Sequence, residues 1–221
     1  MTIERWRSRW EEGRIAFHSD EVHGDLRRWE ARFLSGAQPP RRVLVPLCGK
    51  SRDLDWLARR GHDVVGVEFV EQAVIALFEE SGRAPVRDEL GGVSRWRDGA
   101  LTVLQGDFFA LAELPGLGVF DCVWDRAALV AVEPARRDAY VAVVLGLLRP
   151  GGRVLLNAFE YDQTRRSGPP WSVPDEEVRA RFASRGVERL ARVDAVAANH
   201  EIAAGHDYWW VSTYLVGGAA P

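Results

Sequence analysis

The fold of this chain is decided by residues 42–51, which read Arg42-Val43-Leu44-Val45-Pro46-Leu47-Cys48-Gly49-Lys50-Ser51. An apolar run ends there in a turn with one glycine, and residues 53–58 follow with the apolar spacing of a helix. A second apolar run, residues 63–69, carries Glu68 near its end. Strand, tight loop, helix and strand in this order predict the first βαβ unit of a doubly wound nucleotide-binding sheet.

The spacing within this unit indicates the kind of cofactor. Glu68 lies 19 residues after Gly49, close to the roughly 20 residues that separate a glycine loop from a carboxylate that binds ribose hydroxyls. The loop lacks the G-x-G-x-x-G pattern, so its single glycine gives little indication of a pyrophosphate site. We therefore expect a nucleoside cofactor without phosphates.

The composition is that of one globular domain. The 221 residues are 47% hydrophobic and 28% charged, and the net charge of -3 argues against a nucleic-acid-binding surface. No apolar run approaches the roughly 20 residues that cross a bilayer, and the N-terminus lacks the apolar core of a signal peptide. Two cysteines, Cys48 and Cys122, are too few for a disulfide framework. These features predict a cytoplasmic enzyme that acts on neither nucleic acid nor membrane. We also expect it to be a monomer with a small-molecule partner.

The first 40 residues are predicted to form a helical lid. Trp6 and Trp10 are spaced i, i+4 on one face of a short helix over residues 3–12, and a second helix is predicted over residues 22–34. The segment is too aromatic for a linker. We expect residues 1–40 to pack over the carboxyl edge of the sheet, where open α/β sheets bind ligands.

Strands and helices alternate through most of the remaining chain. Further strands are predicted at 101–109, 119–126 and 153–159, and helices at 71–81, 134–148 and 174–184. Residues 83–99 are either an irregular excursion or a hairpin, and two consecutive strands, 187–196 and 208–216, favour a late antiparallel pair. The prediction is one domain with a mostly parallel seven-stranded sheet: a lid at 1–40, a Rossmann-like core at 41–216 and a tail at 217–221.

Polar groups stand at the ends of several predicted strands. Glu68, Asp107 and Arg126 lie at strand ends, which meet the loop at residues 47–50 along one edge of a parallel sheet. A carboxylate at Glu68 can accept hydrogen bonds from both ribose hydroxyls. Asp107 is expected to face an adenine amine, and Phe108 is expected to stack on the ring. The alternative for each residue is a strand-end cap or a turn.

Other chemistries lack their motifs. The chain has no H-E-x-x-H or C-x-x-C pair, so no metal site is predicted, although His200 and His206 with Asp207 could in principle gather an ion. It has no P-loop and no G-x-S-x-G nucleophile elbow. A dinucleotide-binding dehydrogenase is disfavoured because the single-glycine loop lacks the phosphate-binding turn.

Several motifs, in ordered succession along the chain, resemble the thiopurine S-methyltransferases, particularly their bacterial members. These motifs are Trp6-x-x-x-Trp10, Ala16-Phe17-His18, Pro46-Leu47-Cys48-Gly49-Lys50, Arg60-Gly61-His62-x-Val64-Val65-Gly66-Val67-Glu68, Phe120-Asp121, Trp124-Asp125-Arg126-x-Ala128-Leu129, Tyr161-Asp162 and Gly168-Pro169-Pro170. The pairing of PLCGK with WDRxAL makes the resemblance specific.

The resemblance implies a Rossmann-like class I methyltransferase with S-adenosylmethionine as cofactor and a sulfur, selenium or tellurium atom of a small molecule as acceptor. Carried over by position, it assigns cofactor binding to Trp6, Trp10, Phe17, Leu47, Glu68, Asp107, Phe108 and Arg126. It also implies that Phe17 and Arg126 border the acceptor, with Arg126 as the candidate catalytic residue. The family often has serine in place of Asp107, and Asn199 stands where mammalian members have an arginine before the late histidine.

Two alternatives stay open beside this reading. The related halide and thiol methyltransferases share the lid tryptophans and the late Gly-Pro-Pro. A non-catalytic protein that binds S-adenosylmethionine as a sensor would share the cofactor site alone. The acceptor is equally open among thiopurines, small thiols, selenium or tellurium species and halides.

Overall fold

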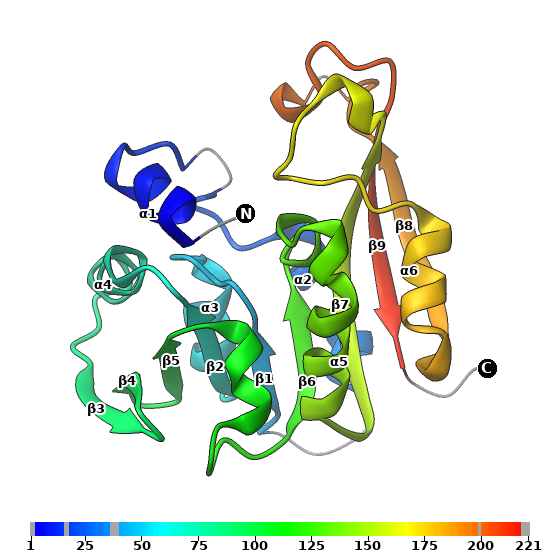
Figure 1. The fold of residues 1–221 in the computed structure, drawn as a ribbon. Coiled ribbons are helices and arrows are strands. Elements are labelled where there is room, and N and C mark those ends of the chain that lie inside the picture. The colour runs from blue at the N-terminus through cyan, green and yellow to red at the C-terminus, as the bar shows by residue number, and fades with distance from the viewer. Residues whose placement is uncertain (1–2, 16–17, 36–39, 199, 218–221) are drawn as a thin grey trace.

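The structure is a computed structural model that describes residues 3–15, 18–35, 40–198 and 200–217 (Figure 1). Its helices are α1 (Ile3–Glu11), α2 (Gly24–Phe33), α3 (Arg52–Arg59), α4 (Glu71–Glu80), α5 (Arg137–Leu147) and α6 (Asp175–Arg181). Its strands are β1 (Arg42–Val45), β2 (Asp63–Glu68), β3 (Val86–Leu90), β4 (Val93–Asp98), β5 (Leu101–Gln105), β6 (Phe120–Asp125), β7 (Leu148–Tyr161), β8 (Val187–Asp194) and β9 (Trp209–Val216). Among the helices described, none is both long and apolar enough to span a bilayer.

The described strands form one sheet in the order β3-β4-β5-β2-β1-β6-β7-β9-β8. The five strands from β5 to β7 run parallel, and β9 is antiparallel to both β7 and β8. The predicted α/β class and the late antiparallel pair are therefore confirmed.

The predicted number of seven strands was wrong, because the described residues contain nine. Residues 83–99 include the antiparallel hairpin β3-β4, which extends the sheet beyond β5. Its turn is Gly91-Gly92, with φ of 55° and 84°. Positive φ at both central residues suits the tight turns that match the twist of a hairpin, and glycine adopts it at little cost.

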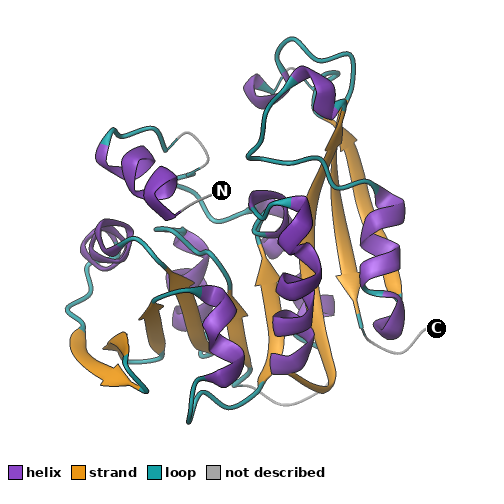
Figure 2. Ribbon diagram, viewed as in Figure 1, coloured by secondary structure: helices purple, strands orange, loops and turns teal. Residues whose placement is uncertain are grey.

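Helices cover both faces of the sheet (Figure 2). One apolar core lies between the sheet and α5 and α6, and the other lies between the sheet and α2, α3 and α4. The strands at the centre are buried on both faces, which explains why they read as continuous apolar runs rather than as alternating patterns.

The strand order places a crevice at the centre of one edge. From β1 the chain moves to β2 and on to β5 on one side, whereas β6 and β7 lie on the other side. The carboxyl ends of β1 and β6 therefore flank the point where the winding reverses, which is where open α/β sheets bind ligands. Helix α1 lies at this edge (Figure 1), where Arg7 sits over the ring of Phe69, 5.4 Å from its centroid.

Candidate active site

A cavity of about 320 Å³ lies at the carboxyl edge of β1, β2, β6 and β7. Its wall combines α1, the loop after β1, the ends of β2, β6 and β7, and the segment at residues 169–170. The lining residues used below are Trp6, Trp10, His23, Leu47, Cys48, Glu68, Phe69, Arg126, Val130, Asn157, Phe159, Pro169, Pro170 and Val211. Segments that are far apart in the sequence thus line a single cavity.

Five of the predicted site residues line this cavity: Trp6, Trp10, Leu47, Glu68 and Arg126. Phe17 lies outside the described residues, as does Asn199. Asp107 and Phe108 are not part of the lining.

The predicted stacking wall at Phe108 is corrected by the structure. The Phe108 side chain is 1% exposed, and its ring packs in the core 5.0 Å from the ring of Tyr140. Asp107 begins the short 3-10 helix Phe108–Glu113, where its carboxylate accepts a hydrogen bond from the Phe109 N–H at 3.0 Å. That turn directs the Phe108 ring inward. Phe69, directly after Glu68, lines the cavity, and the contacts of Asp107 and Phe108 with the cofactor stay predictions.

Glu68 is held at the end of β2 by two backbone donors. One carboxylate oxygen accepts from the Gly49 N–H at 2.9 Å, and the other accepts from the Val70 N–H at 2.8 Å. Burial raises the pKa of this carboxyl group, and the backbone hydrogen bonds oppose that rise. Each carboxylate oxygen has two lone pairs. Glu68 therefore keeps acceptor capacity beyond the Gly49 and Val70 bonds, and the residue lines the cavity.

The loop after β1 is tightly constrained. Leu47 has a φ of 47°, a conformation that costs a non-glycine residue on the order of 1–3 kcal/mol and tends to occur at functional sites. The Cys48 N–H donates to the Val67 carbonyl at 3.0 Å, which joins the loop to β2. A Cβ atom added at Gly66 would lie 2.5 Å from Leu54 and 2.8 Å from the Cys48 sulfur. Glycine at position 66 therefore lets β2 approach the loop closely.

Cys48 lies at the cavity wall as a buried thiol. Cys48 is 7% exposed, and its sulfur lies 3.6 Å from the Gly49 carbonyl oxygen. Burial first, and the charge of Glu68 second, raise the pKa of this thiol well above its ordinary value. The group is therefore held in its protonated form.

Asp53, at the start of α3, lies beneath the cavity and is 0% exposed. It accepts hydrogen bonds from the indole N–H of Trp124 and from the His23 N–H, each at 2.8 Å. The Nε of Arg126 lies 3.8 Å from the same carboxylate. Sequence reasoning missed Asp53, because an acid at the start of a helix is an ordinary dipole-compensating residue.

His23 reaches the cavity from the N-terminus of α2. Its Nδ1 accepts a hydrogen bond from the Asp25 N–H at 3.2 Å, which caps the helix. Burial and the nearby Arg126 lower the pKa of the ring, so it is neutral. In the neutral ring this contact assigns the proton to Nε2. His23 is thus a second residue that the sequence pattern did not single out.

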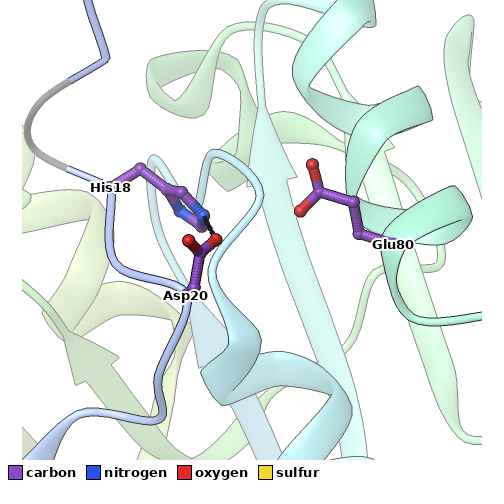
Figure 3. A group of neighbouring side chains, drawn as sticks. All are labelled: His18, Asp20 and Glu80. Atoms are coloured by element: carbon purple, nitrogen blue, oxygen red, sulfur yellow. Dashed lines mark hydrogen bonds and ion pairs between the residues drawn. The ribbon is translucent and has the colours of Figure 1, made fainter.

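A further polar cluster adjoins the cavity at His18 (Figure 3). His18 contacts Asp20 at 3.0 Å, and Glu80 faces them from the end of α4, with their potential ligand atoms within 4.8 Å of one another. Glu80 is already paired with Lys50 at 2.6 Å and with Arg52 at 3.4 Å. We therefore assign the cluster a structural function, in which Lys50 ties the loop after β1 to α4.

The opposite half of the cavity is mainly apolar. Phe159, Pro169, Pro170, Val130 and Val211 line it. The Tyr161 hydroxyl donates to the Pro170 carbonyl at 2.5 Å, which fixes the position of the proline wall. These apolar side chains line the same cavity as the charged Arg126.

Comparison with protein families matches residues 1–215 to the family described as "Thiopurine S-methyltransferase". The chain is 42% identical over 200 residues to a thiopurine S-methyltransferase of Pseudomonas aeruginosa (strain UCBPP-PA14), with 90% of each chain covered. It is 36% identical over 222 residues to a thiopurine S-methyltransferase of Rattus norvegicus, covering 98% of this chain and 91% of that one.

Comparison with solved structures finds the same fold at low sequence identity. The 1,6-didemethyltoxoflavin-N1-methyltransferase of Burkholderia thailandensis, crystallised with S-adenosylhomocysteine, has a TM-score of 0.61 at 20% identity and covers 97% of this chain and 87% of its own. TehB from Haemophilus influenzae has a TM-score of 0.62 at 16% identity and covers 91% and 64%. At this identity the likeness concerns the fold alone.

Proposed function

Because this chain belongs to the thiopurine S-methyltransferase family and is an S-adenosylmethionine-dependent S-methyltransferase, we propose that its acceptor is a small aromatic thiolate. The observation that carries this proposal is the lining of the cavity, which combines the charged Arg126 with a group of apolar side chains. Arg126 stands beside a half that is lined by Phe159, Pro169, Pro170 and Val211. A cation next to flat apolar walls suits an acceptor with a ring body and an anionic sulfur.

The cofactor is assigned to the half of the cavity nearest β1 and β2. Glu68 would bind the ribose hydroxyls, since its two oxygens hold lone pairs beyond those given to Gly49 and Val70. Leu47 and its loop would face the methionine part, and Phe69 supplies an apolar surface for the adenine. When bound, S-adenosylmethionine supplies a methyl group that its sulfonium charge activates toward nucleophiles.

Trp6 and Trp10 would cover the bound sulfonium from α1. Cation–π attraction to such rings contributes on the order of 0.5–2 kcal/mol, and the rings also exclude water. We extend the proposal to residues 1–40 as a lid, with Phe17 completing the enclosure. Its support is the position of Trp10, whose ring would lie 3.4 Å from a Cβ added at Gly49.

Arg126 is proposed to hold the acceptor sulfur. Its side chain is 21% exposed and is anchored from behind by Asp53. An aromatic thiol is largely ionised near neutral pH, so no general base is required. Alignment of donor and acceptor then accounts for much of the rate, as effective molarities in well-oriented systems reach on the order of 10⁵–10⁸ M.

We further propose that the protein acts as a monomer in the cytoplasm. Both cysteines are buried and free, as in proteins of a reducing compartment. Among the described residues, the exposed apolar side chains of Ile75, Val86 and Val193 lie on three different elements, α4, β3 and β8. Sedimentation equilibrium of the full chain tests the oligomeric state.

Methyl transfer from labelled S-adenosylmethionine across a panel of acceptors tests the proposed function. We expect thiophenols and heteroaryl thiols to be methylated with a higher kcat/KM than hydrosulfide, selenite, tellurite or iodide, because only the ring compounds fill the apolar half. Preference for iodide or hydrosulfide would support a halide and thiol methyltransferase instead. Tight cofactor binding without transfer to any acceptor would support a sensor.

Replacement of Arg126 separates its two proposed roles. We expect Arg126→Ala to lower kcat by on the order of a hundredfold while the Kd for S-adenosylhomocysteine rises by less than about tenfold, since the side chain would act mainly on the acceptor. Arg59→Ala, which removes an arginine exposed on α3, is the control. Equal losses in kcat and cofactor affinity would assign Arg126 to cofactor binding alone.

A further inference from the structure

Asn157 is a buried amide at the cavity that the family resemblance did not single out. It lies on β7, is 2% exposed and forms part of the cavity wall. Strand β7 pairs Leu156 with Asp125 of β6, so the next residues of the two segments are Asn157 and Arg126. The amide is thus placed in the acceptor half, beside the residue that is proposed to hold the sulfur.

Two neighbours determine which way this amide points. The Asn157 Nδ2 donates to Asp25 Oδ2 and to Thr213 Oγ1, each at 3.0 Å. The Thr213 hydroxyl in turn donates to the same Asp25 oxygen at 2.7 Å, so its oxygen is free to accept from Asn157. A carboxylate can only accept hydrogen bonds. The nitrogen must therefore face Asp25, and the opposite orientation would set two acceptors against each other.

The Asn157 oxygen is left without a partner. Among the described residues, none donates a hydrogen bond to this buried Oδ1. Buried carbonyl oxygens are nearly always paired. Because the residue that bears this oxygen lines the cavity, a bound ligand is the candidate donor. Since the nitrogen is committed to Asp25 and Thr213, the oxygen is the polar atom that Asn157 can offer to a bound molecule.

We propose that Asn157 is a specificity-determining residue that accepts a hydrogen bond from an N–H group adjacent to the acceptor sulfur. The proposal rests on the function proposed above and narrows it from aromatic thiolates to heteroaromatic thiolates with a neighbouring ring N–H. Arg126 holds the anionic sulfur, and the Asn157 oxygen accepts a hydrogen bond from the ring N–H beside it. An acceptor without that donor leaves a buried carbonyl unpaired, which sites of this kind penalise strongly.

Two probes of nearly the same outline test the proposal. The anion of 2-mercaptobenzimidazole keeps one ring N–H beside the carbon that bears the sulfur, whereas the anion of 2-mercaptobenzothiazole has a ring sulfur there. We expect the wild-type enzyme to favour the first probe in kcat/KM by on the order of tenfold to a hundredfold, after correction for the ionised fraction of each thiol at the assay pH and for the uncatalysed methylation rates of the two anions. Calorimetric binding of each probe to the protein loaded with S-adenosylhomocysteine gives the same comparison without turnover.

Asn157→Leu removes the oxygen and keeps a side chain of similar volume. We expect the corrected ratio to fall to about one, within roughly threefold, while the affinity for S-adenosylhomocysteine is retained. Thr213→Val is the matched control. It removes one partner of the amide nitrogen and leaves the oxygen and the contact with Asp25, so the preference should persist.

Three results would overturn the role of Asn157: no preference in the wild type, binding and methylation of neither probe, or a preference that survives in Asn157→Leu. If Asn157→Leu folds poorly, the preference of the wild-type enzyme and of Thr213→Val between the two probes still tests the proposal, because loss of that preference in either protein contradicts it. These outcomes are distinct from failure of the proposed function, which would appear as absence of transfer to any aromatic thiol in the acceptor panel.

Discussion

Glu68→Gln is expected to weaken the binding of S-adenosylhomocysteine by on the order of a hundredfold, because it removes charge-assisted hydrogen bonds and disturbs the loop that carries Leu47. The carboxylate receives the Gly49 N–H on one oxygen and the Val70 N–H on the other. A glutamine amide has only one oxygen. Whichever way it turns, its NH₂ group faces a backbone N–H, so both the ribose site and the loop lose an acceptor.

Calorimetric titration of the purified variants with S-adenosylhomocysteine measures this effect. Glu71→Gln is the matched control, since Glu71 begins the next helix, is 46% exposed and pairs with Arg87 on the surface. We expect its Kd to stay within about twofold of wild type. A comparably small change for Glu68→Gln would remove Glu68 from the cofactor site.

Asp53→Asn is expected to lower the free energy of unfolding by about 3 kcal/mol, the largest stability loss that we foresee from a single amide substitution here. Asp53 is fully buried and accepts one N–H on each oxygen, from His23 and from Trp124. An asparagine amide would turn its own NH₂ toward one of these donors. It would also leave Arg126 without the counter-charge 3.8 Å away.

Urea unfolding followed by tryptophan fluorescence measures this loss directly. Asp63→Asn serves as the comparison, because Asp63 is 49% exposed and pairs with Arg42 at the surface. Exposed pairs contribute at most about 1 kcal/mol. If the two variants unfold at the same urea concentration, the buried network around Asp53 contributes no more than a surface pair does.

The predicted site residues that line the cavity were found from their spacing along regular structure. Trp6 and Trp10 share a helix face, and Glu68 follows Gly49 by one βα unit, so local geometry alone brings them to one edge. The family is confirmed by the match over residues 1–215 and by the curated relatives, and the cofactor follows from the family. The fold class is confirmed by the methyltransferase neighbours. The roles of the individual site residues stay predictions.

The predictions that failed concern side-chain direction and edge strands. Phe108 was expected at the cavity, yet the turn capped by Asp107 points its ring into the core. The choice between Phe69 and Phe108 depends on that turn, and apolar periodicity does not encode it. For residues 83–99 the hairpin alternative is confirmed, but these residues are largely polar, so no apolar signal indicated that the hairpin pairs with β5 and extends the sheet.

The polar residues that were missed depend on contacts across long stretches of chain. Asn157 meets Thr213 through the register of β7 against β9, and it meets Asp25 through the packing of α2. Asp53 meets Trp124 across the core between α3 and β6. Each looks like an isolated polar residue in the sequence, and only tertiary structure shows that these side chains are partners.

The buried thiol of Cys48 has a consequence for an enzyme whose chemistry is the methylation of sulfur. The protein carries a sulfur nucleophile of its own in the wall of the cavity where the methyl donor is proposed to bind. The reactive form of cysteine is the thiolate, and burial beside Glu68 keeps Cys48 protonated. We infer that this protonation guards the catalyst against self-methylation and against mixed disulfides with its own substrates. The acceptor thiolate that Arg126 is proposed to hold would react, whereas a protonated thiol beside a carboxylate would not.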